Sequence, residues 1–172
     1  MVICAHLPCA TMYAQQHDYN WILGYGGGPG TPVNDSFGLS ILSYKDETLH
    51  IWSNEEEGSM LFDANNVSYS NDSGELLCTF NGKGVYNKDH IAMVNGDEWF
   101  DGDFSAGWFF PQSGIILPLP GNANKLVLLN IELDLIEVEG LLEIAGENLF
   151  YSEIDKTAAE GMGAVTLRKE LL

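Results

Sequence analysis

Hydrophobic and polar residues alternate in short runs along most of the chain, which is typical of strands that turn one face to a core. In the run 37–44, apolar residues occur at every second position from 37 to 41, and Leu49 and Ile51 share a face in the next run. No stretch from residue 20 to residue 120 has helical periodicity. The pattern therefore predicts an all-β chain. The strands expected up to residue 80 are 20–25, 37–44, 48–52 and 76–80.

Turn residues separate these runs closely enough for each strand to pair with the next. Asn71–Gly74 and Asn81–Gly82 flank the short run Leu76–Phe80, and the glycines supply the positive φ that tight turns need. Two tight turns around one strand predict an antiparallel meander. Pro118 and Pro120 lie at the end of the apolar run that begins at Ile115, which favours an edge or terminal strand because proline has no N–H to donate to a neighbour.

Residues 125–144 fit two periodicities. The apolar residues between 131 and 135 alternate with acidic ones, as in a strand, and the alternation resumes after a one-residue slip at Leu135/Ile136. The same segment also fits the apolar stripe of a helix. Gly140 and the β-branched residues favour strands, with a bulge at the slip. Further strands are expected at 148–154 and 164–167.

Composition and charge restrict the classes of partner. The 172 residues are 45% hydrophobic and 19% charged, which is enough apolar material for the core of one domain. Seven Lys and Arg against 25 Asp and Glu give a formal net charge of −18. Such a chain repels phosphate backbones, so nucleic acid is excluded as a partner. No apolar run is long enough for a membrane-spanning helix, so no membrane span is expected.

Residues 1–14 differ from the rest of the chain. They are apolar and rich in small residues, and the sequence turns polar at Gln15, as it does after the cleavage site of a secretory signal peptide. The first basic residue is Lys45, so the positive start of such a peptide is missing. The interpretation is a truncated signal peptide, with a disordered tail as the alternative. Residues 15–172 are expected to form one all-β domain, itself incomplete, located outside the cell or at its surface.

An acidic loop with two glycines spans Asn95–Asp103. Asp97, Asp101 and Asp103 offer hard oxygen ligands, and the glycines let the backbone bend so that carbonyl oxygens can join them. The loop does not have EF-hand spacing, and it contains no Cys or His for a softer metal. If the protein binds a metal, we expect calcium at these three carboxylates. The alternative is a solvated loop, and no other cofactor is expected.

Several segments, in their order along the chain, resemble a known group of proteins. They read NWILGY, GELLCTFNGKGVYN, MVNGDEWFDGD, FPQSGIILPLPG and LFYSEID. This order resembles the N-terminal part of large secreted bacterial proteins that have a β-propeller-like body and commonly end in a type IX secretion sorting domain. The resemblance implies a partial β-propeller-like arrangement of the meanders and an extracellular, surface-associated role. A β-sandwich is the alternative architecture.

Aromatic residues in and after the acidic loop suggest a binding role. Exposed Trp99 and Trp108 would stack on sugar faces or fill a pocket of a partner protein. We therefore predict a non-catalytic extracellular or cell-surface β module with a binding or scaffold role, whose partner is a protein or a glycan. If the two indoles instead pack between strands, they have no such role.

Two other functions stay open. A glycan-acting hydrolase needs a pair of carboxylates on a rigid scaffold, whereas Asp97, Asp101 and Asp103 share one loop. The chain has neither a G-x-S-x-G nor an H-E-x-x-H motif. The remaining alternative is a structural fragment of a larger propeller protein, without activity of its own.

Overall fold

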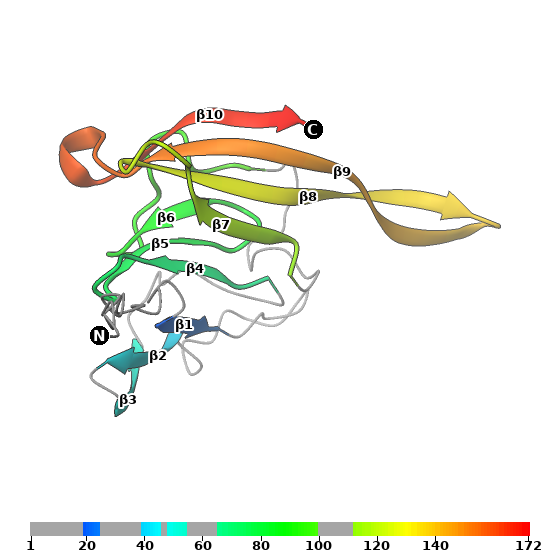
Figure 1. The fold of residues 1–172 in the computed structure, drawn as a ribbon. Coiled ribbons are helices and arrows are strands. Elements are labelled where there is room, and N and C mark those ends of the chain that lie inside the picture. Colours follow the sequence, from blue (N-terminus) through cyan, green and yellow to red (C-terminus); the bar gives the residue numbers. More distant parts are fainter. Residues whose placement is uncertain (1–18, 25–38, 46–47, 55–64, 100–111) are drawn as a thin grey trace, which may run out of the picture.

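The computed structural model describes residues 19–24, 39–45, 48–54, 65–99 and 112–172. These residues form ten strands and one short 3-10 helix, as Figure 1 shows. The elements are β1 (Asn20–Leu23), β2 (Leu39–Lys45), β3 (Thr48–Asn54), β4 (Val67–Ser70), β5 (Leu76–Phe80), β6 (Val85–Asn87), β7 (Gly114–Pro118), β8 (Lys125–Val138), β9 (Leu141–Asp155), η2 (Ala159–Gly161) and β10 (Ala164–Leu171). Among the described residues no helix has the length and apolar character needed to cross a membrane.

The strands form three antiparallel sheets, each a meander in chain order. The first sheet is β1-β2-β3, the middle sheet is β4-β5-β6, and the large sheet is β7-β8-β9-β10. All strand pairs within them are antiparallel. The all-β prediction and its antiparallel meanders are confirmed. The described strands close neither into a propeller nor into a barrel.

The middle sheet lies between the other two (Figure 1). One of its faces packs on the large sheet through Tyr69, Phe80, Leu128 and other residues of the main core. At its other face, Leu76 and Tyr86 pack against buried Ile22 and Ile41 of the first sheet, which form a smaller core. The middle and large sheets are thus packed face to face, as in a sandwich.

Side-chain hydrogen bonds explain why the chain turns where the sequence predicts. The Asn71 Oδ1 atom accepts from the backbone N–H groups of Ser73 and Glu75, both at 2.9 Å, and Gly74 has a φ of 77°. In the next turn the Asn81 Oδ1 atom accepts from the N–H groups of Lys83 and Gly84, at 2.9 and 3.0 Å. Both predicted turns around β5 are confirmed. In each turn an asparagine side chain supplies the acceptor for the backbone N–H groups.

The segment with two periodicities is part of a long hairpin. β8 and β9 pair from Lys125↔Asp155 to Val138↔Leu141, and Gly140 lies in the turn with a φ of 81°. The predicted slip at Leu135/Ile136 is wrong, because these residues pair regularly with Ile144 and Glu143. The register changes instead between Glu132 and Leu133. At that point the hairpin extends past the body of the molecule. Beyond it, the adjacent apolar residues Leu135 and Ile136 do not mark a bulge, because both pair in register.

The predicted edge strand is confirmed. β7 pairs with β8 alone among the described strands, over Gly114↔Asn130 to Pro118↔Leu126. Pro118 ends the strand, where a missing N–H costs least.

Cys78 of β5 is 1% exposed, and burial raises the pKa of its thiol to about 12. This thiol therefore stays protonated and packs as a small core residue.

Candidate functional site

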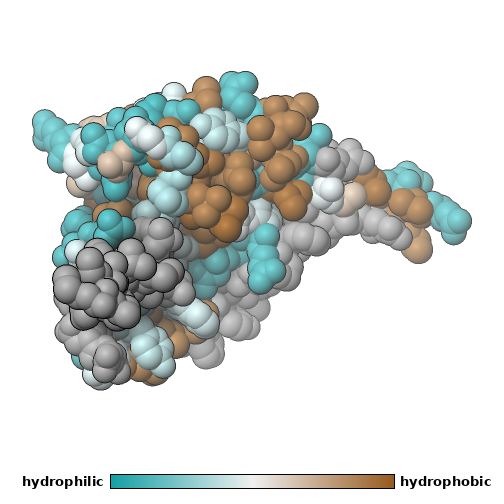
Figure 2. All heavy atoms as spheres, in the orientation of Figure 1, coloured by the Kyte–Doolittle hydropathy of each residue, from teal (hydrophilic) through white to brown (hydrophobic). Residues whose placement is uncertain are grey.

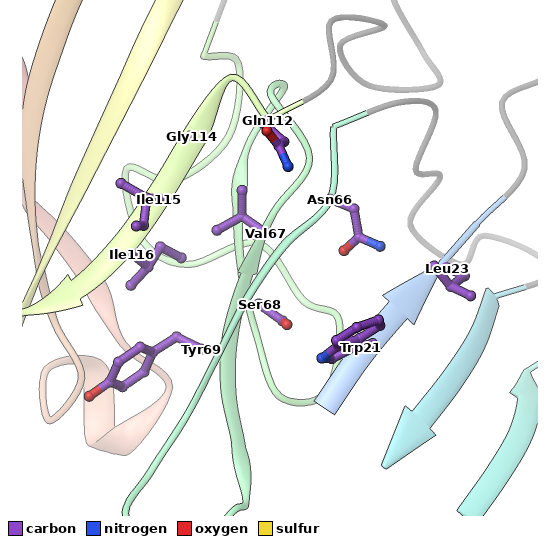
Figure 3. Close-up of a pocket in the computed structure, with 10 residues that line it drawn as sticks. All are labelled: Trp21, Leu23, Asn66, Val67, Ser68, Tyr69, Gln112, Gly114, Ile115 and Ile116. Atoms are coloured by element: carbon purple, nitrogen blue, oxygen red, sulfur yellow. The ribbon is translucent and has the colours of Figure 1, made fainter. Parts of the chain in front are cut away.

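An open groove lies where one strand from each sheet meets the others. Its volume is about 660 Å³. Figure 3 shows β4 in the middle, with β7 on one side and β1 on the other. The lining residues are Trp21, Leu23, Asn66, Val67, Ser68, Tyr69, Gln112, Gly114, Ile115 and Ile116. The groove is therefore a product of how the three sheets stack.

Alternation along β1 places Trp21 in the groove. Asn20 and Ile22 are buried, whereas Trp21 and Leu23 are 61% and 46% exposed. Residues 20 and 22 point to the body because both have partners there: Ile22 packs in the smaller core, and Asn20 makes hydrogen bonds to the middle sheet. Since neighbouring side chains of a strand lie on opposite faces, Trp21 must face outward.

Three hydrogen bonds fix β1 beside β4. The Asn20 Nδ2 group donates to Ser70 Oγ and to the Gly74 carbonyl oxygen, both at 2.8 Å. The Ser68 hydroxyl donates to the Asn20 carbonyl oxygen at 2.5 Å. All of these polar groups are buried or partly buried, so the link is costly to break. It holds the Trp21 indole next to the β4 wall.

The wall opposite Trp21 is largely apolar. Val67, Tyr69 and Ile116 are buried parts of the main core, and Ile115 is 49% exposed. Gly114 lets β7 come close to the middle sheet, because a Cβ atom there would lie 3.1 Å from the Phe80 ring. The groove therefore combines a rigid apolar wall with exposed side chains along its rim.

The described polar residues that line the groove are uncharged. Asn66 and Gln112 are exposed at its edge, and each carboxamide can donate and accept hydrogen bonds. Burial raises the pKa of the Tyr69 phenol, and the negative charge of Asp72 adds to this, so the hydroxyl stays protonated at neutral pH. The described lining residues include no carboxylate, imidazole or ammonium group.

Trp99 is a core residue, as in the alternative in which its indole packs between strands. Its side chain is 2% exposed. The indole meets the Phe80 ring edge to face, with centroids 5.7 Å apart, and the Arg168 guanidinium lies 4.8 Å from its centroid. A surface stacking role for Trp99 is therefore wrong, because this residue joins the main core. Trp108 lies outside the described residues.

Only the first part of the predicted calcium loop is described. Asp97 is exposed, whereas Asp101 and Asp103 lie outside the described residues. The carbonyl oxygens of Asn95 and Glu98 accept hydrogen bonds from Arg168. In the described part of the chain no three Asp, Glu, His or Cys residues gather as metal ligands. Calcium binding stays a prediction, and two of the carbonyl oxygens that it could use are already engaged by a cation.

The groove residues themselves were not among the sites expected from the sequence. Trp21, Asn66 and Gln112 are separated by 45 and 46 positions along the chain. The alternation of residues 20–23 predicts that Trp21 and Leu23 share a face, but not which face is exposed. Only the stacking of the sheets decides this. Comparisons of the chain with protein-family models, with curated proteins and with solved structures find no match.

Proposed function

We propose that the protein is a non-catalytic binding module that takes a neutral glycan in the groove. The observation that carries this proposal is Trp21, whose indole is 61% exposed in a groove that also presents two carboxamides. Sugars offer an apolar face of C–H groups that stacks on aromatic rings, together with hydroxyl groups for hydrogen bonding. The Trp21 indole provides a ring for the C–H face, and the Asn66 and Gln112 carboxamides provide hydrogen-bond partners for the hydroxyl groups.

The size and charge of the groove support a small uncharged ligand. A volume of about 660 Å³ lies within the ~300–1,000 Å³ common for small-molecule sites. The described lining has no cationic residue to pair with an acidic sugar, and the net charge of −18 repels anions. Neutral oligosaccharides are therefore favoured over acidic or sulfated ones.

The chemistry of the lining favours binding over hydrolysis. Glycoside hydrolysis usually needs two carboxyl groups, on either side of the scissile bond. The described lining residues contain none, and Tyr69 is held in its neutral form. This supports a binding role over the hydrolase that the sequence analysis leaves open.

The proposal includes export from the cell. It rests on the apolar opening of the chain and on the resemblance to secreted bacterial proteins of the type IX secretion group, both of which are sequence arguments. Mass spectrometry of cell-surface material should find a mature protein that begins near Gln15. Recovery of the chain from the cytoplasm with Met1 intact would count against export.

The binding experiment is a screen of immobilised neutral oligosaccharides, followed by titration calorimetry of the strongest one. Trp21→Ala should weaken binding at least about tenfold, equivalent to about 1.4 kcal/mol, because stacking is lost. Tyr44→Ala is the matched control, since Tyr44 is an exposed aromatic residue of β2 outside the groove lining. Equal affinity of Trp21→Ala and wild type, or binding confined to acidic glycans, would refute the proposal.

The same oligosaccharide distinguishes binding from catalysis. We expect no new reducing ends after prolonged incubation with the protein. Release of shorter sugars that disappears in Trp21→Ala would show that the groove is a hydrolase site.

A further inference from the structure

The β8–β9 hairpin extends beyond every strand that supports it. β7 covers β8 only as far as Asn130, and β10 covers β9 only from Phe150 onward. Between them, Leu133–Val138 pairs with Leu141–Gly146 and with no other described strand. Figure 1 shows this part reaching well past the body of the molecule. We refer to residues 133–146 as the arm; each of its strands spans about 20 Å.

Among the described strands, none pairs with either outer backbone edge of the arm. A two-stranded hairpin alone is marginally stable in water, and an open edge is a template for pairing with another strand. Apolar side chains are exposed here as well: Val138 is 39% and Leu141 67% exposed. Figure 2 shows hydrophobic and hydrophilic residues together at its tip. The arm thus has the features of a surface that a partner strand completes.

The charge of the arm limits which strand can bind. It contains four acidic residues, and there is no Lys or Arg between Lys125 and Lys156. The four are Asp134, Glu137, Glu139 and Glu143. They occur on both strands and in the turn, so pairing with a second copy of the arm would bring like charges together, which is destabilising. A basic strand would meet complementary charge at the same positions.

We propose that the arm is a docking surface for a basic, extended segment of a partner protein, which adds a strand to one of its edges. Main-chain hydrogen bonds would give affinity, and alternating Lys or Arg and apolar side chains would give specificity. The acidic residues also disfavour pairing between two arms, because their like charges would repel. This surface is separate from the groove, because no arm residue is among the described residues that line it.

Two labelled peptides of alternating sequence test the proposal, one Lys–Val and one Glu–Val, with binding followed by fluorescence anisotropy. The full chain should bind the Lys–Val peptide and not the Glu–Val peptide. Val138→Thr with Leu141→Thr keeps the charge and should weaken binding at least about tenfold. Glu137→Gln with Glu139→Gln keeps the apolar residues and should weaken binding similarly at low salt.

A shortened variant provides the sharpest comparison. Replacing residues 133–147 by Asn-Gly joins Glu132 to Asn148, which are opposite each other, through a two-residue hairpin turn. This variant should keep its near-ultraviolet circular dichroism and lose peptide binding. Undiminished binding by either the shortened or the Thr variant would overturn the proposal, since the peptide would then follow only the overall negative charge. Arm-dependent self-association in sedimentation would overturn it in favour of a second copy.

Discussion

Two tryptophans of this protein show how differently the same side chain is used. The Trp99 side chain is buried in the main core between the middle and large sheets. Its indole meets the Phe80 ring edge to face, and the Arg168 guanidinium lies over the indole. Trp21 lies at the rim of the groove with most of its surface open to solvent. The first contributes apolar burial to the fold, and the second is the residue proposed to contact a ligand. Their roles follow from how the sheets stack, and the experiments below test the contrast.

The largest effect is expected at Trp99. Trp99→Ala should lower the free energy of unfolding by about 3–5 kcal/mol, because it leaves a large cavity beside Phe80 and removes the ring under Arg168. Urea denaturation monitored by far-ultraviolet circular dichroism measures this. A loss below about 1 kcal/mol would mean that Trp99 is not the core residue described here.

A smaller effect is expected at Gly114, which links the two regions. It lines the groove, and a Cβ atom there would lie 3.1 Å from Cδ1 and Cε1 of the Phe80 ring that packs on Trp99. Gly114→Ala should therefore lower the free energy of unfolding by about 1–3 kcal/mol, because the added methyl group overpacks the site. A Gly114→Ala variant as stable as wild type would show that β7 can move away from the middle sheet.

Trp21 should contribute little to stability. Trp21→Ala should change the free energy of unfolding by less than about 1 kcal/mol, because the side chain is largely exposed. The measurement is the same urea titration used for Trp99→Ala. A loss as large as that of Trp99→Ala would erase the contrast and assign Trp21 to the core.

The smallest effect is expected at the partly exposed ion pair of Lys125 and Glu153. The Lys125 ammonium donates to Glu153 at 2.6 Å and, with the Tyr151 hydroxyl, lowers the pKa of that carboxyl. A lowered folded-state pKa stabilises the protein above the ordinary pKa of glutamate, and this stabilisation is lost as pH falls through the folded value. Lys125→Met should therefore lower the free energy of unfolding by less than about 1 kcal/mol at pH 7, and by still less below about pH 4. If Lys125→Met lowered the free energy of unfolding more at acid pH than at pH 7, this pH dependence would be contradicted.

Local signals in the sequence predict much of the middle sheet. Asn71 and Asn81 supply turn acceptors, and alternation defines the strand between them, so β5 and both turns follow from residues close in sequence. The environment of Trp99 cannot be predicted in this way, because Arg168 and Lys169 reach it from about 70 positions away. Its acidic, glycine-containing neighbourhood is typical of an exposed loop.

The groove was beyond sequence reasoning for a related reason. Trp21 and Gln112 lie on separate segments, each of which predicts at most its own strand or turn. Their meeting depends on Asn20, whose side chain is buried against Ser70 although asparagine is usually a surface residue. A polar residue that links two sheets gives no periodic signal.

The central claim, that Trp21 is the ligand-facing indole and Trp99 a core one, is tested most directly by NMR of protein labelled with ¹⁵N at tryptophan. The four indole N–H signals are assigned with single Trp→Phe variants. We predict slow hydrogen exchange for the buried Trp99 indole, and a shift of the Trp21 signal on titration with the oligosaccharide that binds. A bound oligosaccharide that moves the Trp99 signal and leaves that of Trp21 unchanged would contradict the account.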